Sequence, residues 1–127
     1  MSLIALKDLS LTRTATLFTG LDLNLAKGDR LGLAAANGRG KSSLLRILAG
    51  LEEPTTGSLI RARGLVAAFA PQDPPAHLLP MTLHEAVRDA LDAETAEAEG
   101  WRVDILLDDL AVDEALRHRA VRDLSGG

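Results

Sequence analysis

The chain has 127 residues, of which 46% are hydrophobic, 25% are charged and 2% are aromatic, and its net charge is −4. This size and composition indicate a globular domain and exclude collagen-like and disordered chains. The absence of cysteine excludes disulfides and thiolate metal sites, and no apolar run approaches the roughly 18 residues that span a bilayer.

The charge is distributed unevenly along the chain. Residues 1–63 carry nine Lys or Arg against five acids, whereas residues 84–114 carry eleven acids against two Arg. A basic first part favours phosphate ligands, and an acidic second part disfavours a nucleic-acid backbone and is typical of a solvated helix face. Because the N-terminus resembles no secretion signal, we expect a cytoplasmic protein without direct membrane insertion.

The first third of the chain predicts strands. Residues 3–11 alternate imperfectly and predict an edge strand, and Leu21, Leu23 and Leu25 fall on one face of a second strand. After a turn at residues 27–29, the short apolar run 30–35 predicts a central strand that is buried on both faces.

A helix and two further strands follow. Residues 41–49 predict a helix with an apolar stripe of Leu44, Leu45 and Leu48, and Gly50 is its expected stop. Residues 58–62 and 65–72 predict strands, and prolines then prevent regular structure as far as residue 80.

The last third predicts helices only. Thr82 and Glu85 have the spacing of a capping box that starts a helix over residues 83–98. Gly100 separates it from a second helix ending near residue 111, and a short third helix follows residue 113. We therefore expect an α/β fold with a core over residues 1–80 and a helical subdomain over residues 81–127.

The stretch "AAANGRGKSS" at residues 34–43 is typical of a phosphate-binding loop between a strand and a helix. The strict pattern begins with Gly, and this chain has Ala35 there. At the strand end a methyl group is the least costly addition, so we expect the loop to survive. The stretch predicts ATP and Mg²⁺ as ligands.

The expected roles follow from the chemistry of phosphate. Lys41 would reach the β- and γ-phosphates and act in catalysis, and the Ser42 hydroxyl would bind Mg²⁺. The backbone of the loop and the N-terminus of the following helix would surround the phosphates. The predicted nucleotide-binding residues of the loop are Asn37, Gly38, Arg39, Gly40, Lys41, Ser42 and Ser43.

Around this loop the chain resembles the ATP-binding cassette (ABC) superfamily of P-loop NTPases, and "PQDPP" at residues 71–75 is similar to the Uup branch of its ABC-F family. The resemblance covers nearly the whole chain. It implies an ABC nucleotide-binding domain with an antiparallel β subdomain and a helical lobe, of which the chain is an incomplete part.

Two further positions gain roles from this resemblance. Gln72, which lies 31 residues after Lys41, matches a glutamine that contacts Mg²⁺ and the attacking water, so it is a second expected catalytic residue. "LSGG" at residues 124–127 resembles the start of the signature motif. This implies that Ser125, Gly126 and Gly127 contact ATP held by a second, opposing cassette.

Departures from the family pattern limit what the resemblance implies. The adenine-stacking aromatic is absent, and Arg13 aligns near its place, where a guanidinium would stack on the base. Phe18, the nearest ring, is expected in the core. The strand with the Mg²⁺-binding Asp and catalytic Glu would follow residue 127. We therefore expect the chain alone to bind ATP without hydrolysing it at a useful rate.

Three functions remain open from the sequence. The leading hypothesis is the N-terminal part of an ABC-F ATPase, which couples ATP hydrolysis to conformational change and has the ribosome as an expected partner. The second is the ATP-binding subunit of a membrane transporter, which shares every motif described. The third is a non-hydrolytic nucleotide-binding or interaction module, and it differs in lacking a Walker B strand.

Overall fold

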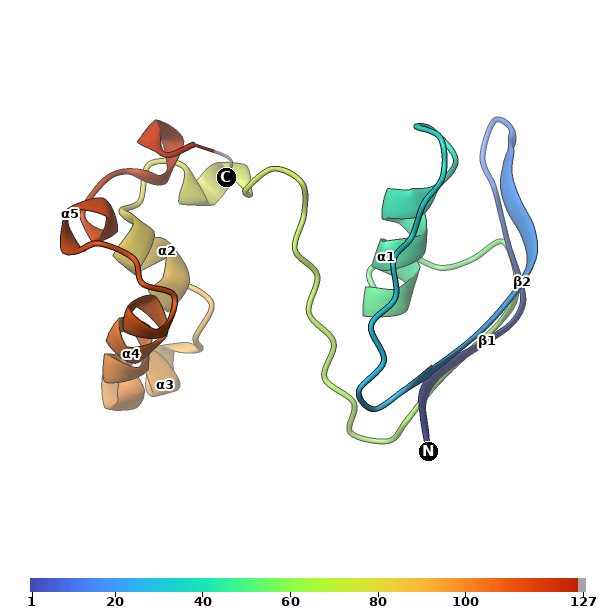
Figure 1. Cartoon of the computed structure of the whole chain (residues 1–127), viewed down its shortest axis with the longest axis horizontal. Coiled ribbons are helices and arrows are strands. Elements are labelled where there is room, and N and C mark those ends of the chain that lie inside the picture. Colours follow the sequence, from blue (N-terminus) through green and yellow to red (C-terminus); the bar gives the residue numbers. More distant parts are fainter. Residues whose placement is uncertain (126–127) are drawn as a thin grey trace. The chain divides into compact units, whose positions relative to one another are not determined.

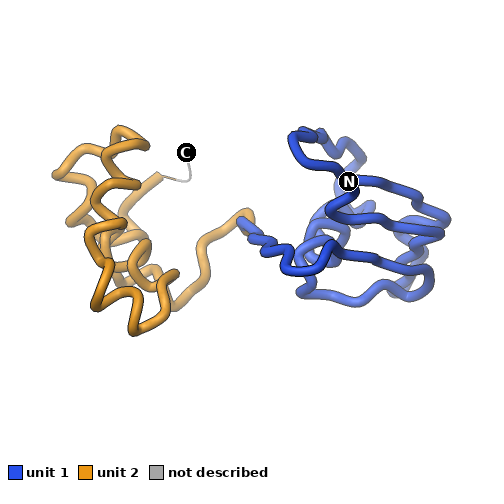
Figure 2. The backbone as a smooth tube through the Cα atoms, turned by 90° about the horizontal axis from the view of Figure 1, so that it is seen from below, with its two compact units in different colours: residues 1–70 blue, residues 71–127 orange. Residues whose placement is uncertain are grey.

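A computed structural model describes residues 1–125 and divides the chain into two compact units, residues 1–70 and 71–127 (Figure 2). The subdomain boundary that the sequence predicts between residues 80 and 81 stays a prediction for the whole cassette. Within the described residues, no helix combines the length and apolar character that crossing a membrane requires.

The first unit is built on an antiparallel sheet. Within residues 1–125, the strands β1 (Ser2–Thr12), β2 (Thr16–Ala26) and β3 (Thr56–Arg61) form one sheet in the order β2-β1-β3. The prediction of an edge strand over residues 3–11 is wrong, because β1 is the central strand and pairs on both sides: Leu6 pairs with Leu23 of β2 and Leu59 of β3. The antiparallel β subdomain predicted from the sequence is confirmed.

A bulge in β1 explains why its sequence alternates imperfectly. Leu6 and Leu9 are both buried, and Lys7 and Asp8 between them are both exposed, so one extra residue resets the alternation. The register of both pairings shifts in this region, and Asp8 has a φ of 51°. Gly57 of β3 crosses close to the bulge, because a Cβ there would lie 2.3 Å from the Asp8 carbonyl oxygen.

The helix α1 (Lys41–Ala49) lies on one side of the sheet (Figure 1). Its apolar residues pack into the core of this unit. Leu44 and Ile47 are buried against the β1 side chains, whereas Leu45 is 44% exposed. The predicted stripe of Leu44, Leu45 and Leu48 is therefore confirmed at Leu44 and at the partly buried Leu48, wrong at Leu45, and lacks Ile47. Gly50 ends the helix in the left-handed conformation with a φ of 82°, as predicted.

Two segments predicted as strands are not strands. In the described part of the chain, residues 30–35 and 65–72 belong to no strand or helix. Every described ladder includes β1, and these segments have no ladder partner. A strand is stable only when its backbone groups are paired, and Leu31 and Val66 remain 61% and 91% exposed. The parallel core is therefore not formed by the described residues.

The second unit is helical. It contains α2 (Leu83–Arg88), α3 (Ala93–Glu99), α4 (Trp101–Asp109) and α5 (Glu114–Arg117), with 3-10 turns at Ala76–Leu78 and Val121–Asp123. The capping box of Thr82 and Glu85 is present. Val103 and Leu107 of α4 are its buried hydrophobic residues.

The helix predicted over residues 83–98 is two helices. Asp92 interrupts it, because its carboxylate accepts hydrogen bonds from the backbone N–H and the hydroxyl of Thr95, both at 2.8 Å. These bonds compete with helix continuation and cap the start of α3 instead. They also lower the pKa of the Asp92 carboxyl.

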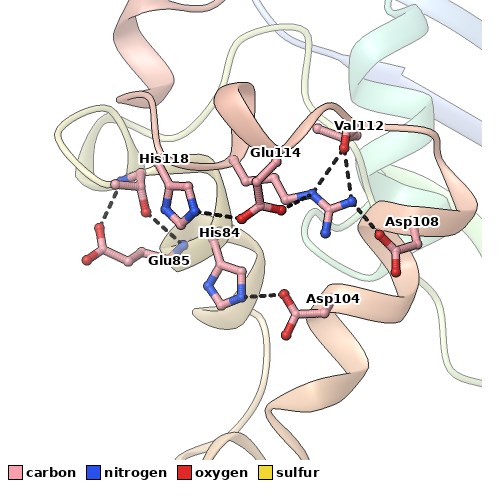
Figure 3. Close-up of polar contacts among 9 residues, drawn as sticks. His84, Glu85, Asp104, Asp108, Val112, Glu114 and His118 are labelled. Atoms are coloured by element: carbon pink, nitrogen blue, oxygen red, sulfur yellow. Dashed lines mark hydrogen bonds and ion pairs between the residues drawn. The ribbon is translucent and has the colours of Figure 1, made fainter.

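A polar network joins the helices of this unit (Figure 3). Arg117, 8% exposed, donates from Nε and Nη2 to the Val112 carbonyl and from Nη2 to Asp108 at 2.5 Å. The bond to Asp108 raises the pKa of Arg117. His84 of α2 bonds Asp104 of α4 at 3.1 Å. The network fixes the α4–α5 connection and holds α2 against α4.

Candidate nucleotide-binding site

The predicted phosphate-binding loop leads directly into α1. The ammonium of Lys41 lies back over the loop and donates to the Ala35 carbonyl oxygen at 2.6 Å. Because this contact uses the backbone of residue 35, it does not depend on whether that residue is Gly or Ala. The departure from the strict pattern is therefore compatible with the loop's geometry.

The backbone of the loop has the conformation that a phosphate cradle requires. Gly38 and Gly40 have φ values of 80° and 87°, in the left-handed region. A Cβ on Gly40 would lie 3.1 Å from the Cβ of Leu17 and 3.2 Å from Cδ1 of Phe18. Gly40 is thus required both by its conformation and by its neighbours.

The start of α1 suits an anion. No side chain caps this end of the helix, and no acidic residue lies in its first turn. The first N–H groups of an α-helix have no partner within the helix, and here no capping side chain bonds them either, while the helix dipole adds partial positive charge there. Together with Lys41, these groups fit a polyphosphate, and the exposed Ser42 supplies a hydroxyl oxygen that fits Mg²⁺.

A cavity of about 290 Å³ adjoins the loop. Phe18 lines it but also packs against the hydrophobic core, as expected from the sequence. Of the predicted nucleotide-binding residues, Arg39, Gly40 and Lys41 line this cavity. Lining a cavity does not test a role in binding, so the predicted roles of all these residues, Asn37, Gly38, Ser42 and Ser43 included, stay predictions.

Arg13 lies in the turn between β1 and β2 and forms an ion pair with Glu52. The side chain of Glu52 is 16% exposed, and it also faces the Nε of Arg46 at 3.5 Å. Sequence reasoning missed Glu52, because the contact joins residues 39 positions apart and no local pattern marks it. The predicted stacking of Arg13 on a base stays a prediction.

The remaining predicted residues belong to the second unit. Gln72 and Ser125 line one cavity of about 860 Å³, together with apolar side chains such as Leu79 and Val121. Gly126 and Gly127 lie outside the described residues. Because Ser42 and Gln72 belong to different units, their shared binding of Mg²⁺ stays a prediction.

The three histidines are used in contacts on the helical unit. His77, His84 and His118 each lie within 3.2 Å of a carboxylate oxygen. Within the part of the chain that the structure describes, no group of three or more His, Cys, Asp or Glu side chains is arranged to hold a metal ion.

Comparison with known proteins places this site in a family. The family model described as "ABC transporter" matches residues 18–127. The zinc import ATP-binding protein ZnuC of Roseobacter denitrificans is 35% identical over 99% of this chain and 45% of its own length. The cytochrome c biogenesis ATP-binding export protein CcmA of Methylococcus capsulatus is 37% identical over 84% of this chain and 51% of its own length.

A solved structure has the same fold. The dimeric, post-hydrolysis ATP-binding cassette MJ0796 bound to ADP and Pi superposes with a TM-score of 0.70 over 97% of this chain and 63% of its own, at 21% identity. The chain thus spans about half the length of the curated relatives it matches. Both relatives carry transporter names, so the expected ABC-F membership is not supported. The chain belongs to the ABC transporter family, and its fold is that of part of an ABC nucleotide-binding domain.

Proposed function

We propose that this chain is the ATP-binding, P-loop part of an ATPase subunit that serves a membrane transporter. The observation that carries the proposal is the family match over residues 18–127, which includes the whole phosphate-binding loop. The likeness to ATP-binding proteins of zinc import and of cytochrome c biogenesis supports a transporter over the ribosomal role of ABC-F proteins. Such a subunit would act at the cytoplasmic side of a membrane.

In this proposal the first unit binds Mg-ATP. Lys41 leaves the Ala35 carbonyl and pairs with the phosphates, while the N–H groups of the loop and of α1 surround the remaining phosphate oxygens. Ser42 would hold the Mg²⁺, and the chemistry that the ion would supply in the whole protein is neutralisation of phosphate charge.

The second unit would respond to the nucleotide. Gln72 and Ser125 line the same cavity, so both predicted residues lie in one region of this unit. We propose that Gln72 contacts Mg²⁺ and the attacking water. In the same proposal, Ser125 with Gly126 and Gly127 contacts the nucleotide of an opposing cassette in a dimer.

Substitution of Lys41 tests the binding step. We expect Lys41→Ala to abolish Mg-ATP binding measured by calorimetry, because the phosphates lose their closest side-chain cation. Lys27→Ala is the matched control, since Lys27 is an exposed lysine of the same unit outside the loop, and we expect it to retain wild-type affinity. Equal affinities of the wild-type chain and Lys41→Ala would contradict a P-loop site.

The source gene tests the transporter assignment. A transporter subunit predicts a single cassette whose sequence continues after residue 127 into an apolar strand ending in Asp-Glu. An ABC-F protein predicts a second cassette after a charged linker. Finding a second cassette would return the assignment to ABC-F, and finding no such strand would remove the ATPase activity from the proposal.

A further inference from the structure

The phosphate site depends on a short helix. With nine residues, α1 is shorter than the roughly 12–15 residues that an isolated helix needs to be stable in water, so contacts with the rest of the unit must hold it in helical form. Its first N–H groups and its dipole attract a phosphate only while the helix is formed. Whatever stabilises α1 therefore also keeps the phosphate site in shape.

The N-terminal end of α1 has no side-chain cap. The cap residue is Gly40, and no side chain accepts a hydrogen bond from this end of the helix. A Ser, Thr, Asp or Asn cap would stabilise the helix by about 1 kcal/mol, but its oxygen would bond the same N–H groups that face a phosphate. A helix that binds an anion at its start has to be stabilised from another place.

Arg61, the last residue of β3, supplies a contact at the opposite end of α1. Its Nη2 donates to the carbonyl oxygen of Ile47 at 3.1 Å and to that of Leu48, both in the last turn. The last carbonyls of a helix have no partner within the helix, and a cation beside them complements the negative end of the dipole. The guanidinium also fills the space beside Gly50, where a Cβ would lie 2.8 Å from Nη1.

The backbone that carries Arg61 is held by the sheet. Arg61 pairs with Ile4 of β1, and the N–H of the next residue, Ala62, donates to the Leu3 carbonyl at 2.8 Å. The Arg61 side chain is partly buried, so it starts from a fixed strand and has limited freedom to leave the helix end. Its two hydrogen bonds consequently fix the last turn of α1 relative to the sheet.

We infer that Arg61 is a positioning residue for phosphate binding: from β3 it holds the last turn of α1, and so keeps the first turn, about 12 Å away along the helix, formed for a phosphate. Without these bonds the end of α1 frays, and a polyphosphate that binds has to order the helix, which uses part of the binding free energy. This inference rests on the proposed nucleotide site and adds to it a residue at the far end of the helix.

The test removes the two hydrogen bonds and keeps an apolar stem. Arg61→Met retains a side chain that can pack as the stem of Arg61 does, without a donor. Binding of Mg-ATP and of Mg-tripolyphosphate, which has the same phosphate chain without a base, is measured by calorimetry on the 127-residue chain. We expect Arg61→Met to weaken the binding of both ligands by the same factor, about three- to tenfold, the range of one net hydrogen bond.

Two further variants separate positioning from a simple loss of charge. Arg63→Met removes the same charge from an exposed arginine two residues along the chain, and both affinities should stay near the wild-type value. Arg61→Lys keeps a cation that can donate to one carbonyl, so we expect it to recover part of the lost affinity.

A purely structural role would lower the stability of the chain and leave the affinity of the folded chain unchanged. Far-UV circular dichroism at the temperature of the binding experiment therefore checks that each variant is folded. If Arg61→Met is partly unfolded, all chains are compared in trimethylamine N-oxide, because this osmolyte favours the folded state.

The outcomes separate this inference from the proposed function. Wild-type affinity of folded Arg61→Met, an equal loss in Arg63→Met, or no recovery in Arg61→Lys would each overturn the positioning role and leave the P-loop site in place. A loss for only one of the two ligands would overturn it as well, because both carry the phosphates that α1 would bind. Failure of the wild-type chain to bind either ligand, or Lys41→Ala binding both like wild type, would instead overturn the nucleotide site itself.

Discussion

At the scale of single residues, the phosphate-binding loop depends on backbone groups more than on side chains. Lys41 is held by the carbonyl of Ala35, and the left-handed φ values of Gly38 and Gly40 orient the loop. The side chains that act directly on a nucleotide in this proposal are few. Two of these side chains, those of Ser42 and Ser43, are chemically identical and adjacent in the chain.

These serines give a matched pair for the magnesium prediction. We expect Ser42→Ala to reduce the affinity for Mg-ATP to the affinity for ATP in EDTA, because the metal loses a hydroxyl ligand that water alone replaces poorly in a fixed site. Ser43→Ala should keep the increase in affinity that Mg²⁺ provides. Calorimetry with and without MgCl₂ measures both, and a Ser42→Ala chain that still gains from Mg²⁺ would remove Ser42 from the metal site.

At the scale of elements, the sheet of the first unit is organised by the bulge in β1. Gly57 has a φ of 91° and would place a Cβ 2.3 Å from the Asp8 carbonyl oxygen, inside the β1–β3 pairing. Gly28 has nearly the same φ, 92°, but a Cβ at that position would meet no atom within 4 Å. The two glycines thus share the conformational strain of a substitution and differ in the clash.

The two glycines are therefore substituted by alanine separately, and the difference between the two costs measures the clash alone. We expect Gly28→Ala to cost about 1 kcal/mol of unfolding free energy from the left-handed conformation. Gly57→Ala should cost about 2 kcal/mol more, because the backbones of β1 and β3 must separate to admit the methyl group. Urea unfolding followed by circular dichroism gives both values, and equal costs would show that the strands move apart freely.

Local signals in the sequence predicted some elements well and others poorly. The capping box at Thr82 and Glu85 and the stop at Gly50 were predictable, because each depends on residues within one helical turn. The break at Asp92 was not, because the apolar pattern continues through it while the carboxylate binds its own backbone. The phosphate-binding loop was predictable from its spacing, whereas Glu52 depends on a contact between distant residues.

At the scale of the whole molecule, the two segments without partners decide how complete the fold is. Residues 30–35 and 65–72 are predicted as strands from their apolar sequence, and they lack strand pairing among the described residues. An apolar pattern indicates that a segment can form a strand. It does not show whether a neighbouring strand is present to pair with it. Leu31, Leu33 and Val66 remain exposed, and exposed apolar side chains next to unpaired backbone groups favour association with a further strand.

Hydrogen exchange tests whether these segments acquire partners in a longer chain. The curated relatives are about twice the length of this chain, and we expect a chain extended to that length to protect the amides of residues 30–35 and 65–70, because strand pairing shields N–H groups from solvent. In the 127-residue chain the same amides should exchange rapidly. The amides of β1 serve as the internal control, since β1 is paired on both sides and should be protected in both chains. Rapid exchange of residues 30–35 in the extended chain would show that this apolar run is not a strand of the complete domain.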